Sequence, residues 1–454
     1  MAYTNFIAAI DIGTHQIRGV VGTKKENGTI LVIAYEAEET NKNVKRGCVC
    51  NPESIAHSIK RLVLKLENKM NGARIAKLYL GFGGQSLKTI TNIETTRIGG
   101  IITRDAAQSL WDKCLHYRME GIDVLATLPP QYMINGRYEL SPVGKSCNSL
   151  EASYKQVVVR PQVRTQLYKL VEDHLKREVA GIIPAPLALA EVMLTQDDKE
   201  DGCVLVNFGA GTTSFAIYRG GHVETMKVIP LGGDTITQDL ATFFSISENE
   251  AERVKQIYGR AISTETKDTK QLISVNTTKG KTAYKQILQK DVERIVEART
   301  AEIIENLYHW VEEADCLPDL RCGIILTGGG SGMKNLATAI EKRFNTETHD
   351  ATIIAEPAFE GKPMTNILDY TVALGMLHMG SINCAGEMED TQVIVPPKVV
   401  QPVEVPPTPS ETVITETEEK EPKKEEPETK PNVRSGRNKF GDLFHKIGKE
   451  VFKG

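Results

Sequence analysis

The fold is indicated by two similar stretches, Ile7-Ala-Ala-Ile-Asp-Ile-Gly-Thr-His-Gln-Ile-Arg-Gly-Val-Val21 and Cys203-Val-Leu-Val-Asn-Phe-Gly-Ala-Gly-Thr-Thr-Ser-Phe-Ala-Ile-Tyr218. In each, an apolar run typical of a buried strand ends in a glycine turn, and a second apolar run follows. Asn207 lies 196 residues after Asp11, and Gly209 has the same offset from Gly13. The common offset predicts a duplicated domain whose two turns present backbone N–H groups to one anionic ligand across a cleft.

The first turn combines groups that bind a phosphate and its metal ion. Gly13 lets the backbone approach a phosphate, Thr14 adds a hydroxyl donor, and Asp11 supplies the hard oxygen that hydrated Mg²⁺ prefers. His15 lies in the same turn, and Arg18 is close enough in sequence to reach the same phosphates. Taken alone, this pattern fits an ordinary tight hairpin equally well.

Two further glycine turns extend the pattern. The second turn carries Gly209, Gly211, Thr212 and Thr213 after its apolar strand. The third follows the apolar run 323–327 and contains the candidate ligand-binding residues Gly328, Gly329, Gly330 and Met333. A glycine-rich loop after a strand is often only structural. The three turns in this order nevertheless resemble the superfamily of ATP-binding proteins that contains actin, the heat-shock chaperones and the sugar kinases.

Further segments resemble one family of that superfamily. Ile229-Pro-Leu-Gly-Gly-Asp-Thr-Ile-Thr-Gln-Asp239 and Ala251-Glu-Arg-Val-Lys-Gln-Ile-Tyr-Gly259 are similar to the connecting segment and the nucleoside-contacting helix of the FtsA family of bacterial cell-division proteins. The resemblance implies that Glu252 and Lys255 approach the ribose and adenine of ATP. A plain surface ion pair between these two residues, three positions apart on a helix, is the competing interpretation.

An inserted module and a last helix complete the resemblance. The strings Arg97-Ile-Gly-Gly100, Ile102-Thr-Arg-Asp105 and Leu128-Pro-Pro-Gln-Tyr132 resemble the extra subdomain of the FtsA family, which implies a protein-contact surface. Residues 370–377 resemble the last helix of the fold. The implied fold class is α/β, with duplicated actin-like (RNase H-like) domains, a nucleotide cleft between them and the FtsA-type insertion. The implied divisions are subdomain IA (1–83 and 163–202), IC (84–162), IIA (203–234 and 291–386) and IIB (235–290).

The sequence departs from the family pattern in the second turn. Relatives usually carry Asp where this chain has Asn207, and a later acidic position of the same motif is Ser214. An amide accepts hydrogen bonds from metal-bound water but contributes no charge and is a poor base. Asp11 and Asn207 are therefore the candidate catalytic residues, with Asp11 also the candidate metal ligand, and we expect ATP hydrolysis to be slow at most.

Composition sets limits on the class of protein. The 454 residues are 40% hydrophobic and carry a net charge of −4. Residues 387–436 account for −6 and residues 437–454 for +3, so the body is nearly neutral, which argues against nucleic-acid binding. The most apolar runs fall short of the ~20 residues that a bilayer helix needs. The N-terminus shows no secretory signal pattern, so we expect a cytosolic protein with reduced thiols.

The C-terminal region predicts a tether and a membrane anchor. Residues 387–434 hold nine prolines and no aromatic residue, which predicts a disordered linker. Residues 435–454 predict a basic amphipathic helix suited to an anionic bilayer surface. Its predicted membrane-binding side chains are Phe440, Leu443, Phe444, Ile447, Val451 and Phe452. Alternatives are a helix that binds a partner's groove or one that docks on the body.

The leading interpretation is a division protein that binds ATP and Mg²⁺. The resemblance implies that it polymerises on the inner face of the cell membrane at the division site. It also implies that it anchors filaments of the tubulin-like protein FtsZ there, with other division proteins as further partners of the insertion. Two alternatives stay open: a small-molecule kinase of the same superfamily, and a scaffold with a degenerate site that does not use ATP.

Overall fold

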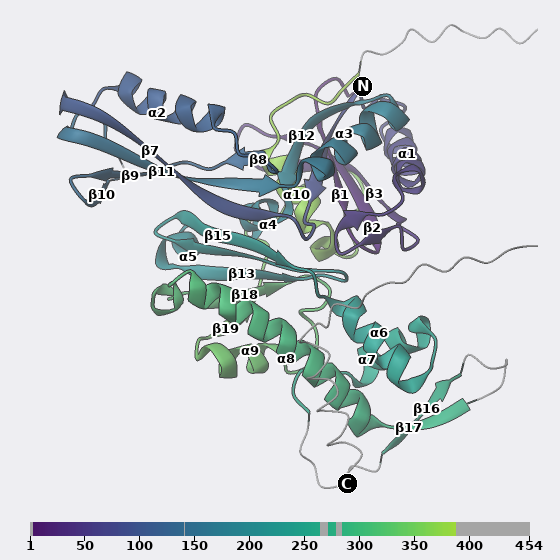
Figure 1. Cartoon of the computed structure of the whole chain (residues 1–454). Coiled ribbons are helices and arrows are strands. Elements are labelled where there is room, and N and C mark those ends of the chain that lie inside the picture. Colours follow the sequence, from purple (N-terminus) through teal and green to yellow (C-terminus); the bar gives the residue numbers. More distant parts are fainter. Residues whose placement is uncertain (1–2, 140, 264–270, 278–283, 387–454) are drawn as a thin grey trace, which may run out of the picture. The chain divides into compact units, whose positions relative to one another are not determined.

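The computed structural model describes residues 3–139, 141–263, 271–277 and 284–386 (Figure 1). The described residues all belong to one compact unit. The predicted linker and the predicted amphipathic helix, with all six of its membrane-binding side chains, lie outside the described residues.

The first sheet has six strands in the order β12-β6-β1-β2-β3-β20. These strands are β1 (Ile7–Ile12), β2 (Gln16–Lys24), β3 (Ile30–Glu39), β6 (Lys77–Phe82), β12 (Glu178–Pro184) and β20 (Ala358–Phe359). β1, β2 and β3 form an antiparallel meander, whereas β6 and β12 run parallel to β1. A separate small ladder joins β4 (Val44–Lys45) to β5 (Cys48–Val49).

The second sheet has ten strands in the order β10-β9-β11-β7-β15-β14-β13-β18-β19, with β8 paired to β11. Its strands are β7 (Lys88–Ile101), β8 (Asp123–Thr127), β9 (Gln131–Ile134), β10 (Arg137–Glu139), β11 (Ser146–Val159), β13 (Cys203–Phe208), β14 (Thr213–Arg219), β15 (His222–Ile229), β18 (Ile324–Thr327) and β19 (Thr348–Asp350). A two-stranded ladder of β16 (Leu272–Asn276) and β17 (Tyr284–Leu288) stands apart from both sheets.

The two sheets share one plan. The order β3-β2-β1-β6-β12 recurs as β15-β14-β13-β18-β19, with an antiparallel meander followed by two parallel strands in both cases. Asp11 pairs with Arg18 across the first hairpin, and Asn207 pairs with Ser214 at the equivalent register of the second. The duplication predicted from the common offset is therefore confirmed.

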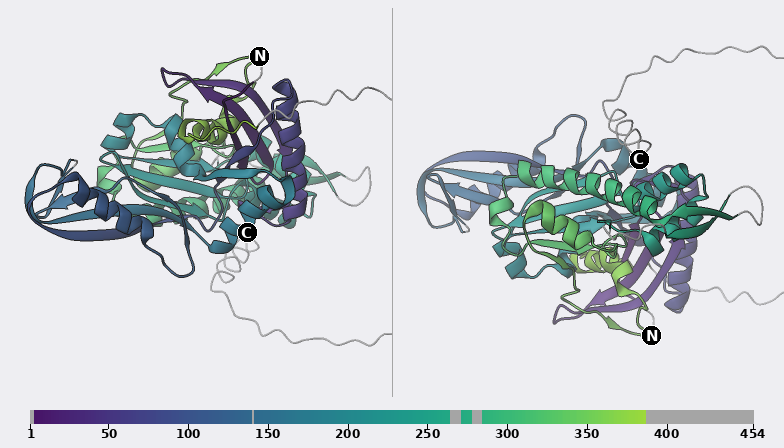
Figure 2. Two further views of the ribbon diagram at one scale, coloured as in Figure 1. Left: turned by 90° about the horizontal axis from the view of Figure 1, so that it is seen from above. Right: turned by 90° about the horizontal axis from the view of Figure 1, so that it is seen from below.

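Helices cover the faces of both sheets (Figures 1 and 2). On the first sheet, α1 and α3 cover one face and α4 and α10 the other. The long α8 lies along the second sheet, with α9 beside it. The helices are α1 (Pro52–Lys69), α2 (Arg104–His116), α3 (Pro161–Leu175), α4 (Ala185–Met193), α5 (Gln196–Asp201), α6 (Gly233–Phe244), α7 (Glu248–Tyr258), α8 (Gln289–Glu313), α9 (Leu336–Phe344) and α10 (Thr371–Met379), with short 3₁₀ turns η1 (Leu317–Asp319) and η2 (Ile367–Tyr370). Within the described ranges, none of these helices combines the length and apolar character needed to cross a bilayer.

Local sequence signals explain the first helix. Asn51 precedes α1, its side chain accepts a hydrogen bond from the Ser54 backbone N–H (3.1 Å), and Pro52 occupies the first turn, where its missing donor costs nothing. The buried positions of α1, which include Ile55, Ile59 and Leu62, recur at helical spacing and pack on the sheet. The cap and the stripe together fix where the helix starts and which face it buries.

The inserted module is joined to the second half of the chain. β7 and β11 pair as two long antiparallel strands that α2 covers (Figure 1). At its base Lys88 of β7 pairs with Lys227 of β15. The Thr89 hydroxyl accepts a hydrogen bond from the Met226 backbone N–H (3.0 Å). The insertion is therefore part of the second sheet and not a free appendage.

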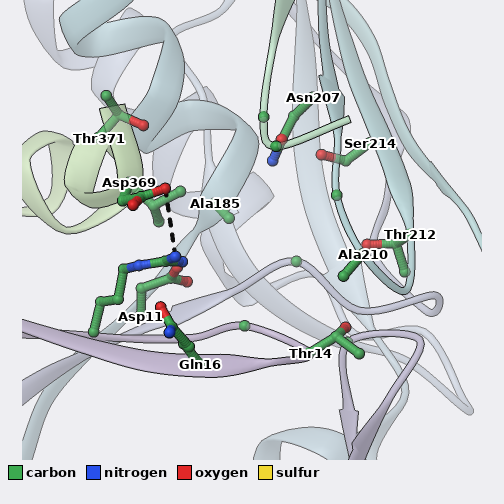
Figure 3. A pocket seen from close by; sticks show the side chains of 18 of the residues that line it. Asp11, Thr14, Gln16, Ala185, Asn207, Ala210, Thr212, Ser214, Asp369 and Thr371 are labelled. Carbon is green, nitrogen blue, oxygen red and sulfur yellow. Dashed lines mark ion pairs between the residues drawn. The ribbon is translucent and has the colours of Figure 1, made fainter. Parts of the chain in front are cut away.

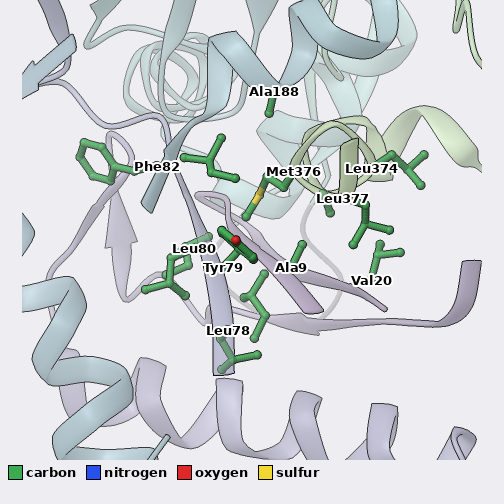
Figure 4. Packing of buried hydrophobic residues seen from close by; sticks show 14 of the residues in the cluster. Ala9, Val20, Leu78, Tyr79, Leu80, Phe82, Ala188, Leu374, Met376 and Leu377 are labelled. Atoms are coloured by element: carbon green, nitrogen blue, oxygen red, sulfur yellow. The ribbon is translucent and has the colours of Figure 1, made fainter. Parts of the chain in front are cut away.

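A close helix crossing secures the first core (Figure 4). Met376 and Leu377 of α10 are fully buried and belong to the same core cluster as Ala9 and Val20 of the sheet. At Gly375, an added Cβ would lie 1.8 Å from the backbone oxygen of Ala188 in α4. Only a residue without a side chain permits this approach of the two helices.

Gly375→Ala is therefore expected to destabilise the protein. Alanine is normally favoured over glycine in a helix by about 1 kcal/mol, whereas overpacking a core typically costs about 1–3 kcal/mol. We expect the clash to prevail, which denaturant unfolding would show as a lower midpoint. Gly361→Ala is the control, because nothing lies within 4 Å of a Cβ at that position. A variant at 375 more stable than wild type would contradict this packing.

Candidate functional site

Two adjoining cavities lie where the three glycine turns meet. The first, of about 260 Å³, is lined by the first two turns, by Gly328 and Gly329 and by residues of α4, η2 and α10 (Figure 3). The second, of about 380 Å³, is lined by the start of α6, by residues of α7 and by the turn after β18. The two cavities share His15, Gly209, Ala210 and Gly329. One elongated ligand can therefore extend from one cavity into the other.

The first two turns have the same backbone geometry. The Gly13 N–H donates to the Gln16 carbonyl (3.0 Å), and the Gly209 N–H donates to the Thr212 carbonyl (2.9 Å). A Cβ on Gly211 would lie 2.5 Å from the Thr14 Oγ1, so the two halves of the chain touch here. The duplicated turns thus meet at the wall of a single cavity.

Asp11 is the carboxylate at the end of β1 that faces the first cavity (Figure 3). Burial raises its pKa to about 6, although the positive charge of Arg18 opposes this rise. A divalent cation beside Asp11 would offset the cost of burying its charge. No group of three or more acidic, His or Cys side chains suited to a metal exists among the described residues. The single buried carboxylate of Asp11 suits Mg²⁺, which is commonly held by one or two carboxylates, water and phosphate oxygens.

Arg18 pairs with Asp11 across the β1–β2 hairpin, and its side chain contacts Asp369. Its guanidinium pairs with the Asp369 carboxylate of η2 at 3.5 Å (Figure 3). Arg18 and Asp369 both line the first cavity. An anion that enters the cavity can therefore meet the Arg18 guanidinium while Arg18 stays paired with Asp369.

The wall contributed by the second half is neutral. Asn207 and Ser214 occupy the register positions that Asp11 and Arg18 occupy in the first half, and both line the first cavity. Thr327 at the end of β18 adds a hydroxyl group to this wall. The two halves therefore present charged and uncharged versions of the same constellation.

The third turn, which follows β18, lies close to the end of β13. Gly328 has a φ of +91°, which glycine adopts readily, and a Cβ there would lie 2.2 Å from the Asn207 Oδ1. The Gly330 N–H donates to the Phe208 carbonyl (2.9 Å). Gly329 is different, because nothing lies within 4 Å of a Cβ built on it, and it lines both cavities. Gly328 thus shapes the turn, whereas Gly329 leaves its space to the cavities.

In the second cavity, Glu252 and Lys255 of α7 are linked at 2.7 Å. The Lys255 ammonium also donates to the Gly233 carbonyl (3.0 Å) and the Thr237 hydroxyl (2.9 Å) of α6. Burial alone would raise the pKa of Glu252, but the hydrogen bonds from Lys255 and Thr237 outweigh it and lower that pKa. Lys255 is only 12% exposed, so a plain surface ion pair does not describe this network.

Most residues predicted for the site line one of the two cavities, with two exceptions. Gly211 lies at the contact between the turns, and Thr213 is buried with its hydroxyl donating to the Leu231 carbonyl (2.9 Å). Other lining residues were not predicted from the sequence, and these include Gln16, Gly47, Gly83, Ala185, Leu189, Asp234, Gln256, Thr327, Lys334, Asp369 and Thr371. Asp234 lies within the segment 229–239 that resembles the FtsA connecting segment, whereas Asp369 directly precedes residues 370–377, the predicted last helix.

Comparisons with known proteins identify relatives. The model of the family described as cell division protein FtsA matches residues 204–375. Cell division protein FtsA of Porphyromonas gingivalis is 32% identical over 340 residues, which are 74% of this chain and 70% of that protein. Cell division protein FtsA of Bacillus subtilis is 25% identical over 407 residues, which are 87% of this chain and 88% of that protein.

A solved structure supports the fold alone. The structure described as the PilM-PilN type IV pilus biogenesis complex matches with a TM-score of 0.56 at 15% identity, covering 82% of this chain and 97% of that chain. The duplicated α/β sheets agree with the actin-like fold that the sequence predicted. On the strength of its relatives, this chain belongs to the FtsA family of bacterial cell-division proteins.

Proposed function

We propose that this chain binds Mg-ATP in the two adjoining cavities and acts as an actin-like switch that anchors division filaments to the membrane. The observation that carries the proposal is the pair of equivalent glycine turns, Gly13 to Gln16 and Gly209 to Thr212, which line one cavity together. Backbone N–H groups at such turns bind phosphates. The second cavity, with Glu252, Lys255 and Met333, would receive the nucleoside.

Membership of a cell-division family supports the wider role. We propose that FtsZ, further copies of this chain and an anionic membrane are its partners, with the membrane contact made by residues 435–454. We propose subdomain IC, residues 84–162, as a contact surface for other division proteins. We likewise propose subdomain IIB as residues 235–290 and subdomain IIA as residues 203–234 and 291–357. Because β20 pairs with β3 and α10 packs in the first core, residues 358–386 are proposed as part of subdomain IA together with 1–83 and 163–202. The protein would act at the cytoplasmic face of the cell membrane.

Slow hydrolysis is part of the proposal. The carboxylates among the described residues that line the first cavity are Asp11 and Asp369. Asp11 is assigned to the metal ion, and Asp369 is paired with Arg18. Asn207 and Ser214 of the opposite wall are poor bases. The cavity therefore offers groups that can bind Mg-ATP, but no unassigned carboxylate of the described residues that line it can act as the base for hydrolysis.

The first test concerns binding. Gly329→Asp should leave the fold intact, because its side chain enters open space, and should abolish nucleotide binding, because its charge faces the phosphates. Calorimetry and thermal shift with Mg-ATP measure the two effects. Gly361→Asp, the same exchange away from both cavities, is the control. Wild-type affinity in Gly329→Asp would refute the assignment of the site.

The second test concerns hydrolysis. A placed general base contributes about 10²- to 10⁴-fold to a rate, so Asn207→Asp should raise phosphate release by at least about tenfold while ATP still binds. The exposed Asn306 of α8 gives the matched control, Asn306→Asp. If release stays unchanged in both variants, the missing carboxylate at 207 does not limit the reaction.

The third test concerns the membrane. Phe444→Glu places a charge within the predicted apolar arc of residues 435–454 and should release the protein from anionic vesicles at any salt concentration. Replacing Lys446 and Lys449 with Gln should weaken binding to anionic vesicles and leave binding to neutral ones unchanged. Vesicle co-sedimentation measures both. Equal sedimentation of Phe444→Glu and wild type would remove the anchor from the proposal.

A further inference from the structure

A contact between a histidine and a carboxylate crosses the boundary between the two cavities. His15 follows the first glycine turn at the start of β2, and Asp234 lies in the first turn of α6. The His15 Nε2 lies 2.7 Å from the Asp234 Oδ1. His15 lines both cavities and Asp234 lines the second. The pair therefore joins the two halves of the chain at the point that an elongated ligand must pass.

The charges around His15 come from two helices, α6 and α7. Asp234 on α6 contacts it directly, and Glu252 and Lys255 on α7 act from farther away. Glu252 and Lys255 already form their own ion pair at 2.7 Å. The charge at the boundary between the cavities therefore depends on His15. With a neutral imidazole, the Asp234 carboxylate faces an incoming anion without a positive charge in contact with it.

We propose that protonated His15 is a ligand for a phosphate group of the bound nucleotide, and that Asp234 is the positioning residue that holds this proton, so that nucleotide affinity depends on pH. The inference rests on the nucleotide site proposed above. In the imidazolium both ring nitrogens donate, so Nε2 holds Asp234 while Nδ1 remains a donor for a phosphate oxygen. In the neutral ring with its proton on Nε2, Nδ1 is an acceptor and repels that oxygen.

The direction of the pH dependence follows from the contacts. The hydrogen bond with Asp234 raises the pKa of His15; burial and the charge of Lys255 oppose this rise, and the charges of Asp234 and Glu252 add to it. Protonated His15 therefore persists to higher pH than an unperturbed histidine. Affinity should be greatest below this raised pKa and should fall as the pH rises through it. One linked proton limits the fall to about tenfold per pH unit.

The experiment is a titration of the full chain with Mg-ADP between about pH 6 and pH 8.5, the range in which histidines lose their proton. The nucleotide's own phosphate ionises near pH ~6, so the readout is the ratio of variant to wild-type dissociation constants. For His15→Gln this ratio should fall towards its limiting value as the pH rises. For Asp234→Asn the pH dependence should move to lower pH, because the hydrogen bond that holds the proton is lost.

An ion pair elsewhere between the two halves of the chain provides the control. Lys42 pairs with Glu248 at the start of α7, and neither residue lines a cavity. Lys42→Gln should therefore keep the wild-type pH profile. A ratio for His15→Gln that does not change with pH, while both proteins bind Mg-ADP, would overturn this inference alone. Failure of the wild type to bind at any pH would overturn the proposed function and this inference with it.

Discussion

The site depends on the contact between the two halves at Gly211. A Cβ there would lie 2.5 Å from the Thr14 Oγ1 and 3.0 Å from the Arg46 backbone nitrogen. Because only hydrogen occupies this space, the two glycine turns approach closely enough to line one cavity. A larger residue would have to separate the halves. The positions of Asp11 and Asn207 relative to each other are a consequence of this approach.

Duplication supplies the scaffold, and divergence supplies the chemistry. Equivalent positions carry Asp11 and Arg18 in one half and Asn207 and Ser214 in the other. A ligand between the turns would thus meet similar backbone donors on both sides but charges on only one. Such asymmetry would orient a polyanion, because a metal ion bound to it would be attracted to the side that holds the carboxylate.

Local patterns made much of the fold predictable. Strand and turn signals located β1, β2, β13 and β14. The site was less predictable, because Asp369 is brought to Arg18 by the packing of α10 on α4, which no local pattern encodes. Thr213 was assigned to the site, although side chains alternate along a strand and its hydroxyl points towards Leu231. The alternation predicts that Thr212 and Thr213 point to opposite sides, so that only one of them, Thr212, lines the cavity.

The inserted module connects the two halves of the chain. β7 pairs with β15 through Lys88 and Lys227, and Lys155 of β11 lies 3.4 Å from Glu224 of β15, with both side chains largely shielded from solvent. The module is therefore connected by its chain to the first half and by hydrogen bonds to the second. These contacts give the two halves of the chain a second connection besides the one at Gly211.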